Sequence, residues 1–169
     1  FAISSEETRY YLNGIYIHAT ESNGDPVLRA VATDGHRLAR VELPLPEGAR
    51  QMPSVIVPRK AVVEIRKLIE DTESDVSISL SESKLCFAIG DTVLTTKLID
   101  GTFPDYERVI PTGNDKLMNV NCRELAEVVD RVATISTEKS RSVKLQLKTR
   151  TLVLSANSPE SGTAREELE

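Results

Sequence analysis

The sequence places an aspartate and a histidine two residues apart, in the segment Thr33-Asp34-Gly35-His36-Arg37. A histidine oriented by a carboxylate is the arrangement that nucleophilic catalysis requires. A spacing of two in a turn does not normally direct the carboxylate at the neighbouring imidazole, and the sequence has no Gly-x-Ser-x-Gly elbow. The pattern therefore favours a tight turn between two strands. A hydrolase that uses Asp34 and His36 stays open as an alternative.

Residues that bind metals or nucleotides are few. Cys86 and Cys122 are the only cysteines, His18 and His36 are the only histidines, and their spacing does not match a zinc site. The sequence has no phosphate-binding P-loop and no GxGxxG motif. We therefore expect no catalytic residues, no metal site and no cofactor.

One loop offers two carboxylates to a cation. Asp100 and Asp105 flank the segment Gly101-Thr102-Phe103-Pro104. A turn that surrounds a buried Phe103 is the interpretation we favour.

Composition limits the class of protein. The chain has 169 residues with 21 Lys and Arg against 26 Asp and Glu, and the net charge of −5 excludes a globally basic nucleic-acid binder but not a local basic face. Hydrophobic residues make up 40%, as in soluble globular proteins. No apolar run approaches the ~20 residues of a membrane helix, and two cysteines without a signal peptide favour the cytoplasm. Because the first residue is Phe1, we expect a piece of a longer protein.

A repeated unit organises the chain. Residues 58–70 and 122–133 both have the apolar spacing of an amphipathic helix. When the two segments are aligned, Ala61 coincides with Leu125. The buried stripes expected from this shift are Ala61, Val62, Ile65, Leu68 and Ile69, and Leu125, Ala126, Val129, Val132 and Ala133. Chance similarity between two amphipathic helices is the alternative.

Alternating strands surround each helix. The expected strands cover residues 9–19, 27–33, 37–43, 76–81, 84–89, 92–98, 143–148 and 151–156, with short strands at 54–57 and 118–121 before the helices. The predicted fold is α+β, built from repeated units of one helix and antiparallel strands. We expect one domain at 1–109, a linker at 110–117 and the first half of a second, similar domain at 118–169.

Basic residues recur on the helix faces opposite the apolar stripes. Arg59, Lys60, Arg66 and Lys67 lie on the first helix, and Arg123 and Arg131 mark the same face of the second. A solvated face with local ion pairs explains either helix alone, but the recurrence favours a surface that meets phosphates without reading bases.

Two further groups of residues are candidates for binding. Tyr10 and Tyr11 follow Arg9 and offer rings to an unpaired base, unless they are half-buried on a strand. Side chains near the turn offer a small groove, although ordinary core contacts explain them as well: Leu12, Thr33, His36, Leu38, Pro104 and Val109.

Four motifs in this order resemble the bacterial DNA sliding clamps, the beta subunits of DNA polymerase III. The motifs are Arg9-Tyr10-Tyr11-Leu12-Asn13-Gly14, Ala30-Val31-Ala32-Thr33-Asp34-Gly35-His36-Arg37-Leu38-Ala39, Val55-Ile56-Val57-Pro58-Arg59-Lys60 and Gly101-Thr102-Phe103-Pro104-Asp105-Tyr106. They resemble the middle domain of the family, and Asn157-Ser158-Pro159-Glu160 resembles the third domain.

The resemblance implies a processivity factor without catalytic activity. Family members form a head-to-tail homodimeric ring with helices inside and sheets outside, through which duplex DNA passes regardless of sequence. The implied partners are the replicative polymerase, the clamp loader and other proteins with a short linear motif. Membrane association is not expected. A stand-alone peptide-binding module remains a second alternative.

The resemblance also implies two sets of site residues. The partner-peptide pocket of the family corresponds to Leu12, Thr33, Gly35, His36, Arg37, Leu38, Pro104, Arg108 and Val109. The DNA-facing set comprises Tyr10, Tyr11, Arg59, Lys60, Arg66 and Lys67, to which the repeat adds Arg123 and Arg131. The other wall of the pocket comes from the distal third domain, which we do not find in this sequence.

Overall fold

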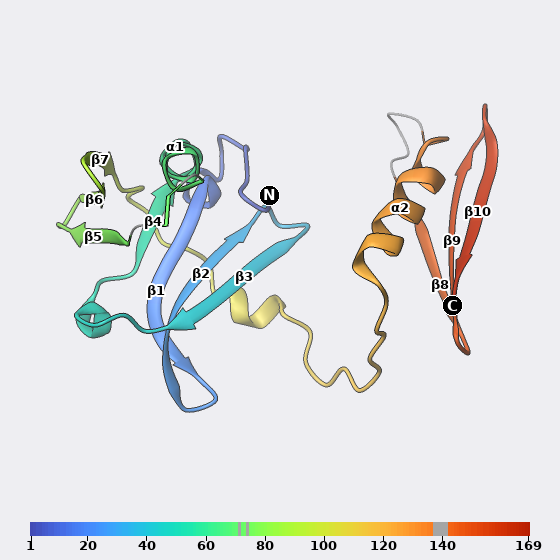
Figure 1. Ribbon diagram of the computed structural model, residues 1–169, viewed down its shortest axis with the longest axis horizontal. Helices are drawn as coiled ribbons and strands as arrows, with labels where there is room; N and C mark the ends of the chain where they lie inside the picture. The colour runs from blue at the N-terminus through green and yellow to red at the C-terminus, as the bar shows by residue number, and fades with distance from the viewer. Residues whose placement is uncertain (71, 74, 137–141) are drawn as a thin grey trace. The chain divides into compact units, whose positions relative to one another are not determined.

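Short antiparallel sheets and amphipathic α-helices make up the chain (Figure 1). The computed structural model describes residues 1–70, 72–73, 75–136 and 142–169. The chain divides into two compact units, Phe1–Ile110 and Pro111–Glu169. Within the described ranges, no helix is both long and apolar enough to cross a bilayer. The α+β class expected from the sequence is confirmed.

Two antiparallel sheets and an α-helix form the first unit. Its strands are β1 (Gly14–Ser22), β2 (Asp25–Thr33), β3 (Leu38–Pro44), β4 (Val55–Pro58), β5 (Val76–Leu80), β6 (Lys84–Ile89) and β7 (Thr92–Lys97). Its helices are α1 (Arg59–Ile69) and the short 3-10 helices η1 (Tyr10–Leu12), η2 (Ala49–Gln51) and η3 (Tyr106–Val109). The strands are hydrogen-bonded in the orders β3-β2-β1-β4 and β5-β6-β7.

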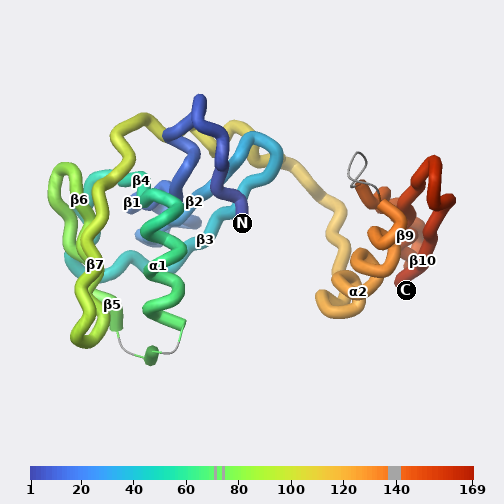
Figure 2. The backbone as a smooth tube through the Cα atoms, turned by 90° about the horizontal axis from the view of Figure 1, so that it is seen from above, coloured from blue at the N-terminus to red at the C-terminus, as the bar shows by residue number. Residues whose placement is uncertain are grey.

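Alternation along β4 explains how α1 is held. Successive side chains of a strand point to opposite faces, so Val55 and Val57 share one face and Ile56 takes the other. The two valines pack with Ala61 of α1 and Leu85 of β6 in one buried cluster. Figure 2 shows α1 lying over the strands, and its contacts are with β1, β4 and β6. A single apolar stripe on the helix therefore covers parts of both sheets.

The opposite face of the four-stranded sheet carries a second buried cluster. Leu12 of η1 and Val31 of β2 pack there with Phe103 and Tyr106, from the segment that follows β7. Tyr16 of β1 stacks on Phe103, with ring centroids 4.8 Å apart and planes 2° apart. The expected burial of Phe103 within its turn is confirmed, since its side chain is 8% exposed. This cluster joins the first residues of the unit to its last.

One α-helix and one antiparallel sheet form the second unit. The elements are α2 (Cys122–Ala133), β8 (Lys144–Lys148), β9 (Thr151–Ser158) and β10 (Gly162–Leu168), with the sheet order β10-β9-β8. α2 packs on β9 and β10, and its Val128 and Val132 meet Leu152 and Leu154 of β9 in the core. Leu145 of β8 and its neighbour Leu147 stay 47% and 65% exposed, because the helix does not extend over that strand.

A strand was expected to begin at residue 9, and this expectation is wrong. The backbone N–H of Leu12 bonds to the carbonyl of Arg9 at 2.9 Å, and that of Asn13 bonds to Tyr10 at 3.0 Å. These bonds close the 3-10 turn η1, and β1 starts only at Gly14. Leu12 is buried in the cluster with Val31 and Phe103. This burial holds the segment in a 3-10 turn, so its side chains do not alternate between two faces as they would in a strand.

The strand expected at 118–121 is also absent from the described structure. In the first unit the equivalent β4 pairs with β1, but the described part of the second unit has no strand equivalent to β1. Asn121 instead caps α2: its Oδ1 accepts the backbone N–H of Arg123 at 2.9 Å and of Glu124 at 3.2 Å.

The expected helix stripes are only partly right. Leu68 and Ile69, at the end of α1, are 37% and 39% exposed, because the helix extends past the strands that it covers. Ala126 is exposed as well, whereas Val128, outside the expected stripe, is buried with 3% of its surface exposed. The helices were therefore predicted at the right residues, but the face that α2 buries is rotated toward Val128.

Candidate functional site

The turn between β2 and β3 gathers five residues singled out in the sequence. β2 and β3 pair through Thr33 and Leu38, so the residues between them form a short hairpin loop. The Thr33 hydroxyl donates to the carbonyl of Arg37 at 2.8 Å and accepts the backbone N–H of Gly35 at 3.1 Å. The tight turn predicted between two strands is confirmed. It holds His36 exposed at its tip.

Asp34 stabilises this turn and does not face an imidazole. Its Oδ1 accepts the backbone N–H groups of Arg37 and His36, both at 3.0 Å, and its Oδ2 accepts Arg37 Nε at 3.0 Å. The bonds from the Arg37 and His36 backbone N–H groups lower the pKa of the Asp34 carboxyl to about 2. The carboxylate oxygens of Asp34 thus bond to residues of their own loop. The geometry gives no support to a hydrolase built on Asp34 and His36.

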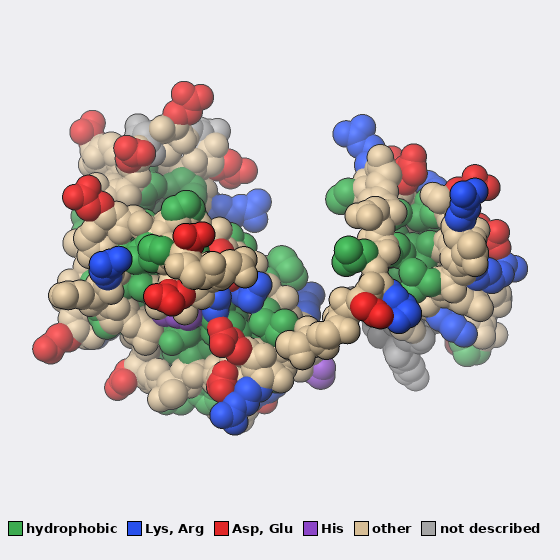
Figure 3. All heavy atoms as spheres, turned by 90° about the horizontal axis from the view of Figure 1, so that it is seen from below, with side chains coloured by type: hydrophobic (Ala, Val, Ile, Leu, Met, Phe, Trp, Pro, Cys, Tyr) green, Lys and Arg blue, Asp and Glu red, His purple; other side chains and the backbone are tan. Residues whose placement is uncertain are grey.

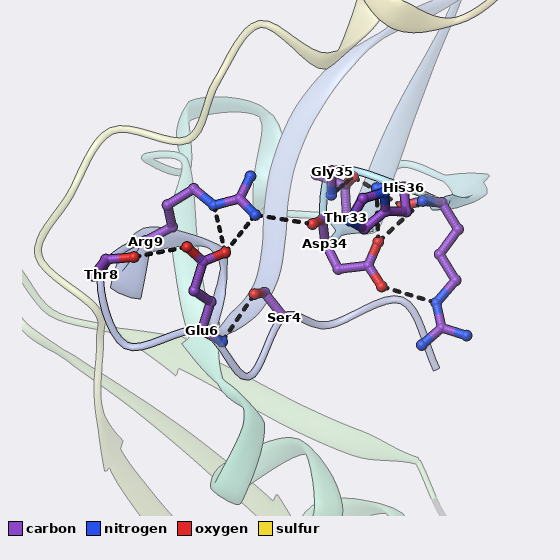
Figure 4. Close-up of polar contacts among 9 residues, drawn as sticks. Ser4, Glu6, Thr8, Arg9, Thr33, Asp34, Gly35 and His36 are labelled. Atoms are coloured by element: carbon purple, nitrogen blue, oxygen red, sulfur yellow. Dashed lines mark hydrogen bonds and ion pairs between the residues drawn. The ribbon is translucent and has the colours of Figure 1, made fainter. Parts of the chain in front are cut away.

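Arg9 ties the start of the chain to the same turn (Figure 4). Its Nε donates to Glu6 at 2.8 Å, and its Nη2 donates to Glu6 and, at 3.3 Å, to the carbonyl of Asp34. The guanidinium lies close to Gly35, where a Cβ would be 2.9 Å from Nη1. Gly35 also has a φ of +89°, so both the backbone conformation and the close approach favour glycine.

The two tyrosines directly follow Arg9 in sequence and lie on the 3-10 helix η1. Tyr10 is 53% exposed and Tyr11 is half-buried, and their rings meet edge to face at 5.8 Å. Gly101 lets them pack closely, since a Cβ there would be 3.1 Å from the Tyr11 Cβ. The Tyr10 ring is therefore exposed to solvent, while its packing with Tyr11 and Gly101 holds it in place.

The segment that ends in η3 brings Pro104, Arg108 and Val109 to the surface. Arg108 is paired with Asp105 at 2.7 Å, while Val109 is 68% exposed. That ion pair engages one of the two carboxylates considered for a cation. No group of metal-binding side chains is found among the residues that the structure describes.

The nine predicted pocket residues occupy three neighbouring places in the first unit. Leu12 and Leu38 pack in the cluster that contains Tyr106 of η3. The turn supplies Thr33, Gly35, His36 and Arg37, and the η3 segment supplies Pro104, Arg108 and Val109. A polar hollow of about 430 Å³ also brings His36 and Arg37 together with Arg59 of α1.

Along α1 the four cations predicted to face DNA are exposed. Arg59, Lys60, Arg66 and Lys67 all lie outside the core, and none packs against the strands. Lys67 is paired with Glu64 at 3.1 Å on the same helix. Figure 3, seen from below, shows a different face, on which acidic side chains are spread over the first unit.

On α2 one of the two predicted cations is held by an acid. Arg123 is exposed in the first turn. Arg131 forms a two-pronged pair with Glu166 of β10, with Nε and Nη2 each 2.9 Å from a carboxylate oxygen. The hydrogen bonds from Arg131 lower the pKa of Glu166. The repeat therefore located Arg131 but gave no sign of its partner.

A buried polar network was missed in the sequence. Arg29 of β2 is 4% exposed and donates from Nη1 to the Tyr106 hydroxyl at 2.8 Å and to Glu107 at 2.5 Å. Its Nε donates to Glu42 of β3 at 2.7 Å. His18 Nε2 lies 2.9 Å from the same Tyr106 hydroxyl. One signal was available: Arg29 stands between Val27 and Val31, on the buried side of an alternating strand.

Comparison with known proteins covers the whole chain. Residues 1–105 match the family described as DNA polymerase III beta subunit, central domain, and residues 107–169 match the C-terminal domain of the same subunit. A beta sliding clamp of Caulobacter vibrioides is 53% identical over 169 residues, which cover 100% of this chain and 45% of the relative. The Escherichia coli beta sliding clamp is 38% identical over 171 residues, with the same two coverages.

Solved structures give the same result. A Caulobacter crescentus beta sliding clamp, with PEG bound to its putative beta-motif tethering region, matches with a TM-score of 0.94 and 53% identity over 100% of this chain and 45% of that chain. A Bartonella birtlesii sliding clamp bound to griselimycin matches with a TM-score of 0.92 and 54% identity over 99% and 45%. The chain thus spans about half the length of these relatives. It belongs to the bacterial DNA polymerase III beta subunit family, the sliding clamps, and corresponds to their central and C-terminal domains.

Proposed function

We propose that this chain is the part of a sliding clamp that helps to enclose duplex DNA and to hold replication proteins on it. The observation that carries the proposal is the match of the entire chain, at 53% identity, to a beta sliding clamp. The proposed assembly is a head-to-tail homodimeric ring of the longer protein. The domain boundaries at 109 and 118 and the cytoplasmic location are part of the same proposal.

The DNA-facing role rests on charge that is free to meet phosphates. The chain carries a net charge of −5, so nonspecific attraction to DNA is weak over most of its surface. Arg59 and Lys60 are exposed at the start of α1 and form no ion pair with the residues that the structure describes. Contacts to phosphates carry no sequence information. Such contacts suit a ring that moves along duplex DNA of any sequence, with Tyr10 and Tyr11 beside it.

The partner-binding role rests on the first unit. In this proposal buried Leu12 and half-buried Leu38 supply the floor of the site, and exposed Val109 supplies an apolar side chain at its rim. A small apolar site gives short peptide motifs a modest affinity, which allows partners to exchange. The partners in the proposal are the replicative polymerase, the clamp loader and other proteins that carry the motif. A Bartonella relative binds griselimycin, and we propose this compound as a probe for the same site in this chain.

We infer that the chain acts without catalysis. Asp34, the carboxylate nearest a histidine in sequence, is bonded to the backbone of its own turn. What the clamp contributes is retention: once a ring is closed around DNA, weak contacts to phosphates are enough, because dissociation requires the ring to open or to reach a DNA end.

The experiment that tests enclosure compares two shapes of DNA. This chain replaces the matching stretch of the Caulobacter relative, and the chimera is loaded by the Caulobacter clamp loader onto a nicked circle. We expect it to stay bound on the circle and to be lost within minutes after a single cut linearises the DNA. The unmodified relative is the control. Equal loss from circular and linear DNA would contradict enclosure and leave only a peptide-binding module.

A further inference from the structure

Arg29 is the one strongly buried cation among the described residues, and it links three elements of the first unit. It lies on β2, and its guanidinium reaches Glu42 on β3 as well as Tyr106 and Glu107 on η3. Burying a guanidinium is unfavourable unless its hydrogen bonds are satisfied. Two of its acceptors, Tyr106 and Glu107, are on η3, so the position of η3 determines whether the charge is satisfied.

The Tyr106 hydroxyl is held from two sides. Arg29 donates to it at 2.8 Å, and the hydroxyl in turn meets His18 Nε2 at 2.9 Å. Burial lowers the pKa of His18, so its ring is neutral near pH 7, and burial raises the pKa of Tyr106, so its hydroxyl keeps the proton. The consistent assignment has Tyr106 accepting from Arg29 and donating to His18. Each bond polarises the next in such a chain.

Packing orients the Tyr106 ring as well. The ring is 6% exposed and meets Phe103 edge to face at 6.5 Å and Tyr16 at 6.4 Å. Arg108 and Val109, farther along η3, lack this support: among the described residues Arg108 pairs with Asp105 of its own turn, at 2.7 Å, and Val109 is 68% exposed. Tyr106 and Glu107 are therefore the points through which η3 is fixed to the sheet.

We propose that Arg29 is a positioning residue for the partner site: by holding Tyr106 and Glu107 it sets where Arg108 and Val109 stand on the surface of the first unit. Arg29 itself is buried and does not touch a partner. The family match to the C-terminal domain begins at residue 107, so this contact fixes the first residues of that domain's sequence on the sheet of the central domain. The part that concerns partner binding rests on the proposed function, whereas the placement of η3 does not.

The test uses the 169-residue chain and compares Arg29→Gln with Arg40→Gln. Arg40 also pairs with Glu42, at 3.4 Å, but it is exposed and forms no hydrogen bond or ion pair with η3 among the described residues, so it controls for loss of charge beside that acid. The first readout is the backbone order parameter of residues 106–109 by NMR relaxation. In Arg29→Gln we expect it to fall from about 0.85 toward 0.6, with β1 and β2 unchanged. Arg40→Gln should leave it unchanged.

A second variant keeps the proposal testable if Arg29→Gln fails to fold. Tyr106→Phe removes only the hydroxyl and retains the ring, and it should loosen the same residues by a smaller amount. If order stays unchanged at 106–109 in both variants, Arg29 does not position η3. The proposal also fails if order is lost equally along β1 and β2, because that result describes general stability alone.

The second readout is the affinity for griselimycin by calorimetry, measured on the chimera because it contains the rest of the third domain. We expect Arg29→Gln to weaken it by about tenfold, the usual effect of losing a hydrogen bond to a charged group, and Arg40→Gln to leave it unchanged. Leu38→Asp, which places a charge on the pocket floor, is the positive control for loss. If the chimera without further substitution does not bind griselimycin, the proposed pocket fails and the NMR result still decides the role of Arg29. If η3 loosens but the affinity holds, the pocket stands and the link between η3 and binding is overturned.

Discussion

α1 and α2 share one sequence pattern but differ in how they present their cations. Lys67 on α1 corresponds to Arg131 on α2. Lys67 pairs within its own helix, with Glu64 at 3.1 Å, whereas Arg131 is held by Glu166 of β10 at 2.9 Å. Glu166 therefore neutralises Arg131 from a neighbouring strand, whereas the charge of Lys67 is balanced from within its own helix. The repeat in the sequence therefore predicts where a charged residue lies. Whether that charge is free to bind a phosphate depends on the residues of the neighbouring strand.

The two helices also differ in how they are anchored. α1 packs against strands of both sheets of its unit, and Glu64 occupies a half-buried position on it. α2 packs against a single sheet, and the matching position holds Val128, which is 3% exposed. Asn121 caps α2, whereas α1 follows Pro58 without a side-chain cap. The helix with fewer neighbouring layers thus has the more apolar core face and the stronger cap.

The largest expected effect distinguishes the two cores. Leu85 and Leu154 lie on the middle strands β6 and β9, at 1% and 0% exposure. Replacing either with alanine should cost about 2–5 kcal/mol of unfolding free energy. In the second unit Leu154 belongs to the single cluster identified there, so we expect Leu154→Ala to unfold that unit. Leu85→Ala should leave the first unit folded, because its second cluster, around Phe103, remains.

Hydrogen exchange followed by mass spectrometry measures this effect for each unit separately. Leu154→Ala should remove protection from β9 and β10 and leave β1 and β2 protected. Leu85→Ala should weaken protection along β6 without abolishing it along β2. Equal loss in both units from either substitution would show that the two cores unfold as one.

The next effect concerns the available charge on each helix. In the chimera, changing both Arg59 and Lys60 to Glu should lower DNA affinity and reduce the slope of log affinity against log salt, by about 0.9 for each phosphate that the helix no longer neutralises. The same change at Arg123 and Arg131 should reduce it less, because Glu166 already neutralises Arg131. Titration of a labelled duplex at several salt concentrations gives both slopes. An equal reduction would mean that the pair with Glu166 opens on DNA.

Much of the fold was predictable because it depends on local pattern. Strand 84–89 and helix 122–133 have the predicted bounds, since apolar periodicity and turn residues determine them. The segment at Tyr10 was mispredicted because the burial of Leu12 in a distant cluster overrides its alternation. The strand expected at 118–121 failed for a similar reason: pairing requires a partner strand, which no local pattern can supply.

The candidate site was also predictable in part, because some of its features depend on local sequence and others on contacts between residues far apart in the chain. The turn at Asp34 follows from Asp-Gly chemistry, and the structure confirms it. Arg131 and Glu166 are 35 residues apart in sequence, and Arg29 is 77 residues from Tyr106 and 13 from Glu42. Pairing of β2 with β3 brings Glu42 to Arg29, whereas packing of α2 on β10 and of the η3 segment on its sheet brings the other partners together. The pocket residues came from the family resemblance and the DNA-facing residues from the resemblance together with the repeated helix pattern, and both sets remain predictions.

The smallest expected effect tests whether Glu166 is what makes α2 differ from α1. Glu166→Gln keeps the shape of the side chain and removes the charge that holds Arg131, so the guanidinium becomes available to a phosphate. DNA affinity of the chimera should rise slightly, and the salt slope should steepen by up to about 0.9. Glu167→Gln is the matched control: it removes the same charge from the next residue of β10, which pairs with Arg165 and not with α2. If both variants raise the affinity equally, the gain is explained by a weaker general repulsion between the acidic strand β10 and DNA. A rise confined to Glu166→Gln would show that one carboxylate on a neighbouring strand sets the charge that the second helix presents to DNA.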